Sequence, residues 1–97
     1  WITTVDELPN PQALGIRTWV SGELMQDGNT ANMVFSVAEL IAFIASSFTL
    51  EPGDVITTGT PAGVGVARTP PRFLRDGDVV RVEIDGLGAI EHPVIGA

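Results

Sequence analysis

The sequence contains no cysteine, and all five of its basic residues are arginines. The lack of cysteine excludes a disulfide scaffold, a thiolate-bound zinc or iron–sulfur centre and a thiol nucleophile, and it fits a cytoplasmic location. Twelve acidic residues outnumber the arginines, so the formal net charge is −7. A chain with this balance has too little positive charge to neutralise rows of phosphates, which argues against nucleic acid and anionic membranes as partners.

Long hydrophobic runs are also missing. The longest candidate, residues 34–48, contains Ser36, Glu39, Ser46 and Ser47 and falls short of the roughly 20 apolar residues that span a bilayer. No basic segment followed by an apolar stretch opens the chain, so no signal peptide is predicted. Because it starts at Trp1 rather than Met, we expect a processed, truncated or incompletely ordered polypeptide.

Apolar residues nevertheless make up 44 % of only 97 residues. A domain of this size buries about two-thirds of the surface that its unfolded chain exposes, so its core is thin. The excess of apolar residues therefore predicts a surface that needs a partner, either a missing part of the same protein or a second subunit.

Strand patterns dominate both ends of the chain. Residues 1–15 are broken by proline, asparagine and glycine and predict an irregular lead-in. Apolar alternation over residues 16–26 predicts a hairpin that turns at Ser21-Gly22 and closes with a further turn at residues 27–29. A short strand is expected over residues 55–58, and a second hairpin over residues 79–84 and 89–94.

One helix is predicted in the middle of the chain. Ser36 and Glu39 have the spacing of a capping box, and apolar residues recur at helical intervals from Val37 to Phe48. The helix must end before the turn at residues 51–54, and its apolar stripe is expected to face a core.

The most unusual stretch is the glycine-rich loop of residues 59–65. Its glycines allow close approach of the backbone to a ligand, and Thr60 is its only hydroxyl. The loop lacks the lysine of a phosphate-binding P-loop and is not followed by the helix of a dinucleotide-binding fold. A tight loop in which glycine only relieves strain is the plainer interpretation. A Thr60 hydroxyl held here could donate to a carboxylate or an enolate oxygen.

Other candidate groups are weak. His92, the only histidine, lies in a predicted strand without a nucleophile motif nearby and is expected to be structural or exposed. Arg68 and Arg72 could attract an anionic substrate, although surface arginines are commoner. Acidic residues such as Asp76 and Asp78 flank turns and show no metal-ligand spacing, so no metal site is predicted within this chain. The residues alone thus indicate half of an active site.

Several motifs, in order, resemble the C-terminal half of the fumarylacetoacetate hydrolase family, in particular its branch of 2-hydroxyhepta-2,4-diene-1,7-dioate isomerases, 5-carboxymethyl-2-hydroxymuconate isomerases and acylpyruvate hydrolases. The resemblance covers nearly all of residues 1–97. It rests on Trp1-Ile2-Thr3, on Arg17-Thr18-Trp19-Val20 with Gly22-Glu23, on Thr58-Gly59-Thr60-Pro61 with Gly63-Val64-Gly65, and on residues 6–9, 26–30, 35–41 and 50–56.

The resemblance implies a mainly β fold with one helix and a mixed, rolled sheet, assembled as a homodimer. It also implies Mg²⁺ or Mn²⁺ bound through a Glu-x-Glu pair and an aspartate, which polarises the 2-oxo group of a dioic acid substrate during hydrolysis, isomerisation or decarboxylation. The family's substrate-contacting threonine corresponds to Thr60, which is the candidate catalytic residue, and the resemblance makes Gly59 and Thr60 the candidate substrate-binding residues.

The sequence departs from the family pattern because the carboxylates, an active-site lysine and a lid would all precede Trp1. We therefore expect the metal ligands to lie outside this chain, the chain to pack against a missing N-terminal half, and the fragment alone to be inactive. The alternative is a non-catalytic β-domain with a structural or dimerisation role.

Overall fold

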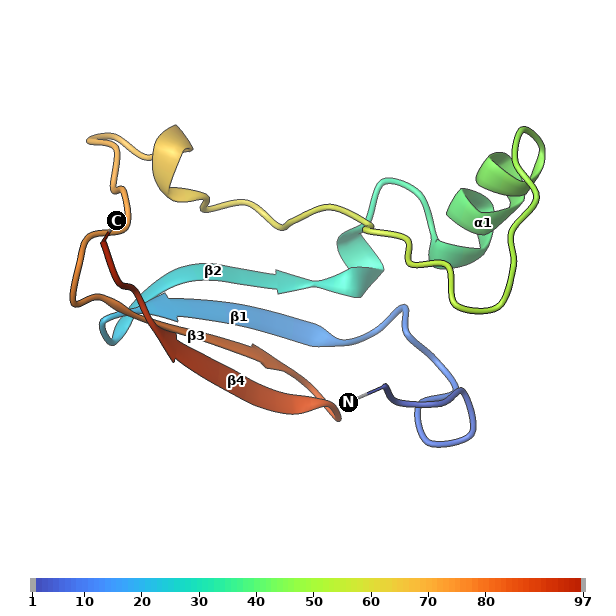
Figure 1. The fold of residues 1–97 in the computed structure, drawn as a ribbon, viewed down its shortest axis with the longest axis horizontal. Coiled ribbons are helices and arrows are strands. Elements are labelled where there is room, and N and C mark those ends of the chain that lie inside the picture. Colours follow the sequence, from blue (N-terminus) through green and yellow to red (C-terminus); the bar gives the residue numbers. More distant parts are fainter. Residues whose placement is uncertain (1, 97) are drawn as a thin grey trace.

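The structure, a computed structural model, describes residues 2–96 and is built around one antiparallel sheet (Figure 1). Its four strands have the order β2-β1-β3-β4. The strands are β1 (Gly15–Val20), β2 (Glu23–Asn29), β3 (Val79–Ile84) and β4 (Gly88–Pro93). A mainly β fold with one helix is therefore confirmed; the three strand pairings among the described residues are all antiparallel, whereas the resemblance implies a mixed sheet.

Both predicted hairpins form. Ser21 and Gly22 have φ values of 49° and 84°, the positive values that a two-residue hairpin turn requires. The predicted turn at residues 27–29 is wrong, because these residues continue β2 and pair with Gly15, Ile16 and Arg17 of β1. Pairing with β1 thus overrides the local turn preference of the Asp-Gly-Asn sequence.

Helix α1 (Val37–Ala45) begins as predicted. The Ser36 hydroxyl accepts a hydrogen bond from the Glu39 backbone N–H at 3.2 Å, and the Glu39 carboxylate accepts one from the Ser36 N–H at 2.7 Å. The hydroxyl of Ser36 also donates to this carboxylate, and these bonds lower the pKa of Glu39. The side-chain oxygen of Gln12 accepts from the Val37 N–H at 2.7 Å.

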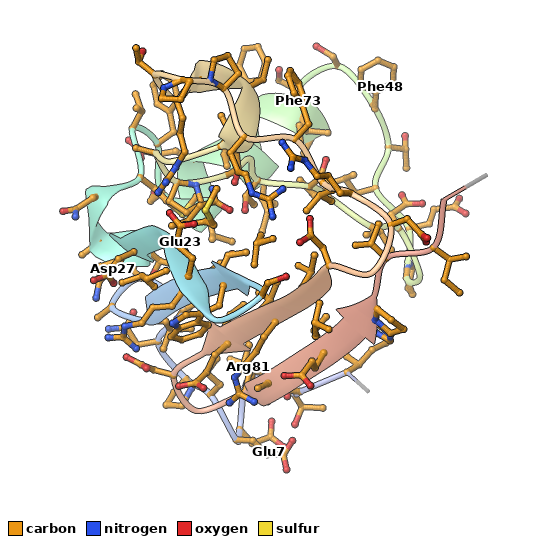
Figure 2. The ribbon with its side chains drawn as sticks, turned by 90° about the vertical axis from the view of Figure 1, so that its left-hand side faces the viewer. Glu7, Glu23, Asp27, Phe48, Phe73 and Arg81 are labelled. Atoms are coloured by element: carbon orange, nitrogen blue, oxygen red, sulfur yellow. The ribbon has the colours of Figure 1, made fainter. Side chains whose placement is uncertain are left out.

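The predicted core face of α1 is only partly covered by the described residues. No residue of the helix is buried, and Ile41 and Phe48 of this apolar stripe are 43 % and 70 % exposed. In the view of Figure 2, Phe48 and Phe73 point away from the sheet, whereas Glu23 and Asp27 lie along β2.

The predicted strand at residues 55–58 is absent. This segment is extended but pairs with no strand among the described residues, and Val55 is 88 % exposed. The chain runs back past β2 here (Figure 1) and includes the single-turn helix η2 (Gly65–Ala67); a similar turn, η1 (Thr30–Asn32), follows β2. The composition of residues 55–58 favours a strand, but a strand also needs a neighbouring strand for its backbone hydrogen bonds.

The core is as thin as the composition indicates. Val20 and Met25 are the only buried apolar side chains among the described residues. The accessible surface is 7350 Å², against about 5,300 Å² for a folded monomer of this mass. The radius of gyration is 15.6 Å, against about 13 Å for a 100-residue domain. The chain therefore leaves a large apolar surface uncovered.

Within residues 2–96, no helix has both the length and the apolar character needed to cross a membrane. The cytoplasmic location expected from the sequence stays a prediction.

Candidate functional site

The glycine-rich loop lies against one edge of the sheet and forms part of an open cavity of about 530 Å³. The other walls come from the end of β2, from η1 and from the start of α1. The cavity is lined by Ile16, Asp27, Gly28, Asn29, Thr30, Asn32, Met33, Val34, Phe35, Leu40, Thr58, Gly59, Thr60, Pro61 and Ala62. Asp27 is the only charged residue in this lining, so most of the polar groups there are neutral.

Thr60 is an exposed residue that lines this cavity, and it is hydrogen-bonded to Gln26 of β2. The side-chain nitrogen of Gln26 lies 2.9 Å from the Thr60 hydroxyl oxygen and 2.7 Å from the Pro61 carbonyl oxygen. Gln26 is half-buried and does not line the cavity. The strand thus holds both the loop backbone and the hydroxyl of a residue that lines the cavity.

Two glycines let the loop approach the strand closely. A Cβ at Gly28 would lie 2.7 Å from the Cβ of Pro61. Gly63 has φ +106°, and a Cβ there would collide with the Met25 carbonyl oxygen. Glycine at these two positions therefore serves contact between loop and strand. At Gly59, by contrast, φ is +99° and an added Cβ would meet no atom within 4 Å.

Arg68 completes the attachment of the loop. Its guanidinium donates to the Met25 carbonyl at 3.1 Å and to the Leu24 carbonyl at 3.4 Å, and it pairs with the Glu23 carboxylate at 3.2 Å. Arg68 does not line the cavity. The hypothesis that it attracts an anionic substrate therefore gives way to a structural role at the strand edge.

Arg72 does not line the cavity either. Its guanidinium binds both carboxylate oxygens of buried Asp78, at 2.8 and 2.9 Å. Asp78 accepts further hydrogen bonds from the Ser21 hydroxyl and the Arg75 N–H. The Arg72 guanidinium, followed by these two donors, holds the pKa of Asp78 well below its usual range. Asp78 therefore joins the first hairpin to the second through Ser21, and Arg72 attaches the loop before β3 to the same carboxylate.

The remaining predicted groups lie apart from the cavity. His92 is exposed on β4, at the opposite edge of the sheet from β2, as expected for a residue without a catalytic partner. Asp76 accepts a hydrogen bond from the Gly96 N–H. Within residues 2–96, no three His, Asp or Glu side chains gather closely enough to hold a metal ion.

A second cavity, of about 290 Å³, lies between the lead-in segment and the second hairpin. It is lined by Thr3, Leu8, Val82, Ile84, Leu87, Gly88, Ala89 and Ile90. Among the described residues its lining holds no titratable side chain and one side-chain hydroxyl, that of Thr3, so we place the candidate site at the first cavity.

Gln26 and Gly28 are the residues of the site that the sequence reasoning did not single out. Gln26 is 34 residues from Thr60, so no local spacing connects them. The composition of residues 27–29 predicts a turn and gives no sign of the contact between Gly28 and Pro61.

Comparison with known proteins places this site in context. Residues 1–95 match the family model described as fumarylacetoacetate (FAA) hydrolase C-terminal. A curated relative, the mitochondrial oxaloacetate tautomerase of Xenopus laevis, is 55 % identical over 94 residues, which are 97 % of this chain and 30 % of that protein.

Several solved structures are also similar to this chain. The fumarylacetoacetate hydrolase of Exiguobacterium antarcticum is 43 % identical with a TM-score of 0.94, covering 99 % of this chain and 34 % of its own. Maleylpyruvate hydrolase of Sphingobium sp. SYK-6, in complex with manganese(II) and pyruvate, is 40 % identical with a TM-score of 0.86, covering 98 % and 33 %. The 2-hydroxyhepta-2,4-diene-1,7-dioate isomerase of Mycobacterium marinum is 41 % identical with a TM-score of 0.77, covering 89 % and 31 %.

In every one of these comparisons the chain spans about a third of the length of the relative.

Proposed function

Because the chain belongs to the fumarylacetoacetate hydrolase family, we propose that it is part of an isomerase or hydrolase that acts on a 2-oxo acid. The names of its relatives support this substrate class, since oxaloacetate, maleylpyruvate and pyruvate all carry a keto group beside a carboxylate. These relatives are named as enzymes, so nothing favours the alternative of a purely structural β-domain.

In this proposal Thr60 donates its hydroxyl hydrogen bond to the substrate carboxylate. The observation that carries it is the position of Thr60, exposed on a cavity whose polar side chains are all neutral except for one carboxylate. Neutral donors suit a carboxylate ligand, because each N–H or O–H pointed at it forms a charge-assisted hydrogen bond. The backbone at Gly59, where no side chain intrudes, leaves room for the same ligand.

The described residues do not fit a divalent cation on their own, since they offer no cluster of three ligands. The manganese in the maleylpyruvate hydrolase complex supports a divalent cation, Mg²⁺ or Mn²⁺, in the full-length protein. In this proposal its ligands lie in the part of the protein outside this chain.

The uncovered apolar surface of α1 and of residues 46–75 is proposed to receive that remaining part, in a homodimeric protein. The length of the relatives supports a larger protein, and the accessible surface is about 2,000 Å² above that expected for a folded monomer of this mass.

The test uses the full-length protein assayed for tautomerisation of oxaloacetate and for hydrolysis of acylpyruvates, with Mg²⁺ or Mn²⁺ added. Thr60→Val removes the donor but keeps the shape, and we expect kcat/KM to fall by roughly 30- to 1,000-fold, as for loss of one oxyanion donor worth about 2–4 kcal/mol. Thr57→Val, at an exposed threonine that does not line the cavity, is the matched control.

Two results would contradict the proposal. An active protein in which Thr60→Val matches Thr57→Val would remove Thr60 from the site. Failure of the full-length protein to turn over any 2-oxo acid with either metal would overturn the enzymatic function itself.

A further inference from the structure

We propose that Gln26 is a positioning residue that directs the hydroxyl proton of Thr60 toward the cavity. The inference rests on the proposed function, because it assigns Gln26 a role in the contact between Thr60 and substrate. It adds a residue from a different element, 34 positions away in the sequence.

The Pro61 carbonyl fixes the orientation of the Gln26 amide. A carbonyl oxygen can only accept a hydrogen bond, so the amide atom 2.7 Å from it must be the NH₂ group. The opposite orientation would put two acceptor oxygens at this distance with no proton between them. The same nitrogen lies 2.9 Å from the Thr60 hydroxyl oxygen, so its second hydrogen points there.

Thr60 is consequently the acceptor in its bond with Gln26. A hydroxyl oxygen has one proton and two lone pairs, and accepting from Gln26 uses one lone pair while leaving the proton free. The hydroxyl of Thr60 donates to no other described residue. Since Gln26 is outside the cavity lining and Thr60 is within it, the free proton is available to a carboxylate bound in the cavity.

A glutamine suits this task better than a glutamate of the same shape. A carboxylate at position 26 would accept the Thr60 proton, which turns the hydroxyl away from substrate, and it would repel the Pro61 carbonyl. The neutral amide stays a donor at every pH in the working range of an enzyme. Pairing of Gln26 with Thr18 across the hairpin holds the residue in the strand register that reaches the loop.

The experiment measures kcat and KM of the full-length protein with Gln26→Met and Gln26→Glu, each alone and combined with Thr60→Val. Gln26→Met removes the hydrogen bonds to the Thr60 hydroxyl and to the Pro61 carbonyl, and we expect kcat/KM to fall about 3- to 10-fold. Gln26→Glu reverses the hydroxyl, and we expect a fall of at least about 30-fold, mainly through KM, because the carboxylate is bound in both the ground and transition states.

Dependence on pH separates positioning from packing. Protonation of the glutamate restores one donor, so the ratio of kcat/KM for Gln26→Glu to that for Gln26→Met should rise as the pH falls toward about 4. Both variants should have little further effect in the Thr60→Val background, because the hydroxyl they orient is gone. Thermal unfolding checks that each variant is folded. If Gln26→Glu does not fold, the inference is tested by comparing Gln26→Met, Thr60→Val and the double variant with the wild type.

Equal kcat/KM for the two Gln26 variants at every pH, or losses that add fully to that of Thr60→Val, would overturn the inference. Thr60→Val impaired with Gln26→Met and Gln26→Glu both normal would reject the positioning role and leave the proposed function intact. A normal Thr60→Val would reject the proposed function instead.

Discussion

The contact between the glycine-rich loop and β2 can be tested at Gly63 with an internal control for backbone strain. Gly63 and Gly53 have nearly the same φ, +106° and +103°, but only Gly63 faces another part of the chain. A Cβ at Gly63 would collide with the Met25 carbonyl oxygen, whereas a Cβ at Gly53 would meet no atom within 4 Å. Both Gly63→Ala and Gly53→Ala should therefore lose stability because of the positive φ, and only Gly63→Ala should lose more because of the collision.

The magnitudes follow from these two terms. Positive φ costs an alanine about 1–2 kcal/mol at either position. The collision at Gly63 adds about 1–3 kcal/mol, the usual cost of forcing an extra carbon into a packed contact. This chain is about a third of the length of its relatives. At about 2.1 cal/mol/K of unfolding entropy per residue, each kcal/mol lowers Tm by about 1.6 °C in a protein of that length, so Gly63→Ala should unfold roughly 2–5 °C below Gly53→Ala.

The assay is thermal and denaturant unfolding of the full-length variants, together with kcat/KM for a 2-oxo acid. If Gly63→Ala pushes the loop away from β2, Thr60 loses its bond to Gln26, so activity should fall in this variant and not in Gly53→Ala. Equal Tm and equal kcat/KM in the two variants would refute the close approach as the reason for glycine at position 63.

Two further predictions concern stability. Asp78→Asn should lower Tm at neutral pH relative to Asp6→Asn, an exposed control. The folded state depresses the pKa of Asp78, so the contribution of this carboxylate to stability is present above the unfolded pKa of about 4 and is lost as the pH falls below it. We therefore expect the Tm of the wild type to approach that of Asp78→Asn between pH 6 and pH 2. A difference in Tm that stays constant over this range would contradict the argument. Ser36→Ala should destabilise the protein by about 1 kcal/mol through loss of the cap of α1, measured by urea unfolding, whereas Ser47→Ala should have no comparable effect.

Local signals in the sequence correctly predicted the elements that local chemistry determines. The turn at Ser21-Gly22, the capping box of Ser36 and Glu39, and the second hairpin all depend on residues within a few positions of one another. Prediction was wrong where a distant neighbour decides. Residues 27–29 have the composition of a turn but are kept in β2 by pairing with β1, and residues 55–58 have the composition of a strand but find no strand to pair with among the described residues.

The candidate site was only partly predictable for the same reason. Thr60 stood out because it is the one hydroxyl in a glycine-rich loop, and the structure places it on a cavity. Arg68 stood out as a charge, but its partners are backbone carbonyls 43 and 44 residues earlier, which no pattern of charge reveals. Gln26 belongs to one of the motifs shared with the family, but its role carries no sequence signal, because an amide becomes informative only when its acceptors are known.

The loop that carries Thr60 also covers the outer edge of the sheet. β2 pairs only with β1 among the described residues, so the backbone groups on its other side need protection. Arg68 occupies the carbonyls of Leu24 and Met25, and the segment from Pro61 to Gly63 lies against the same strand. One set of contacts thus protects the edge and fixes the position of Thr60. A substitution that loosens the loop should therefore expose a strand edge and impair the site together, while Thr60→Val should impair the site alone.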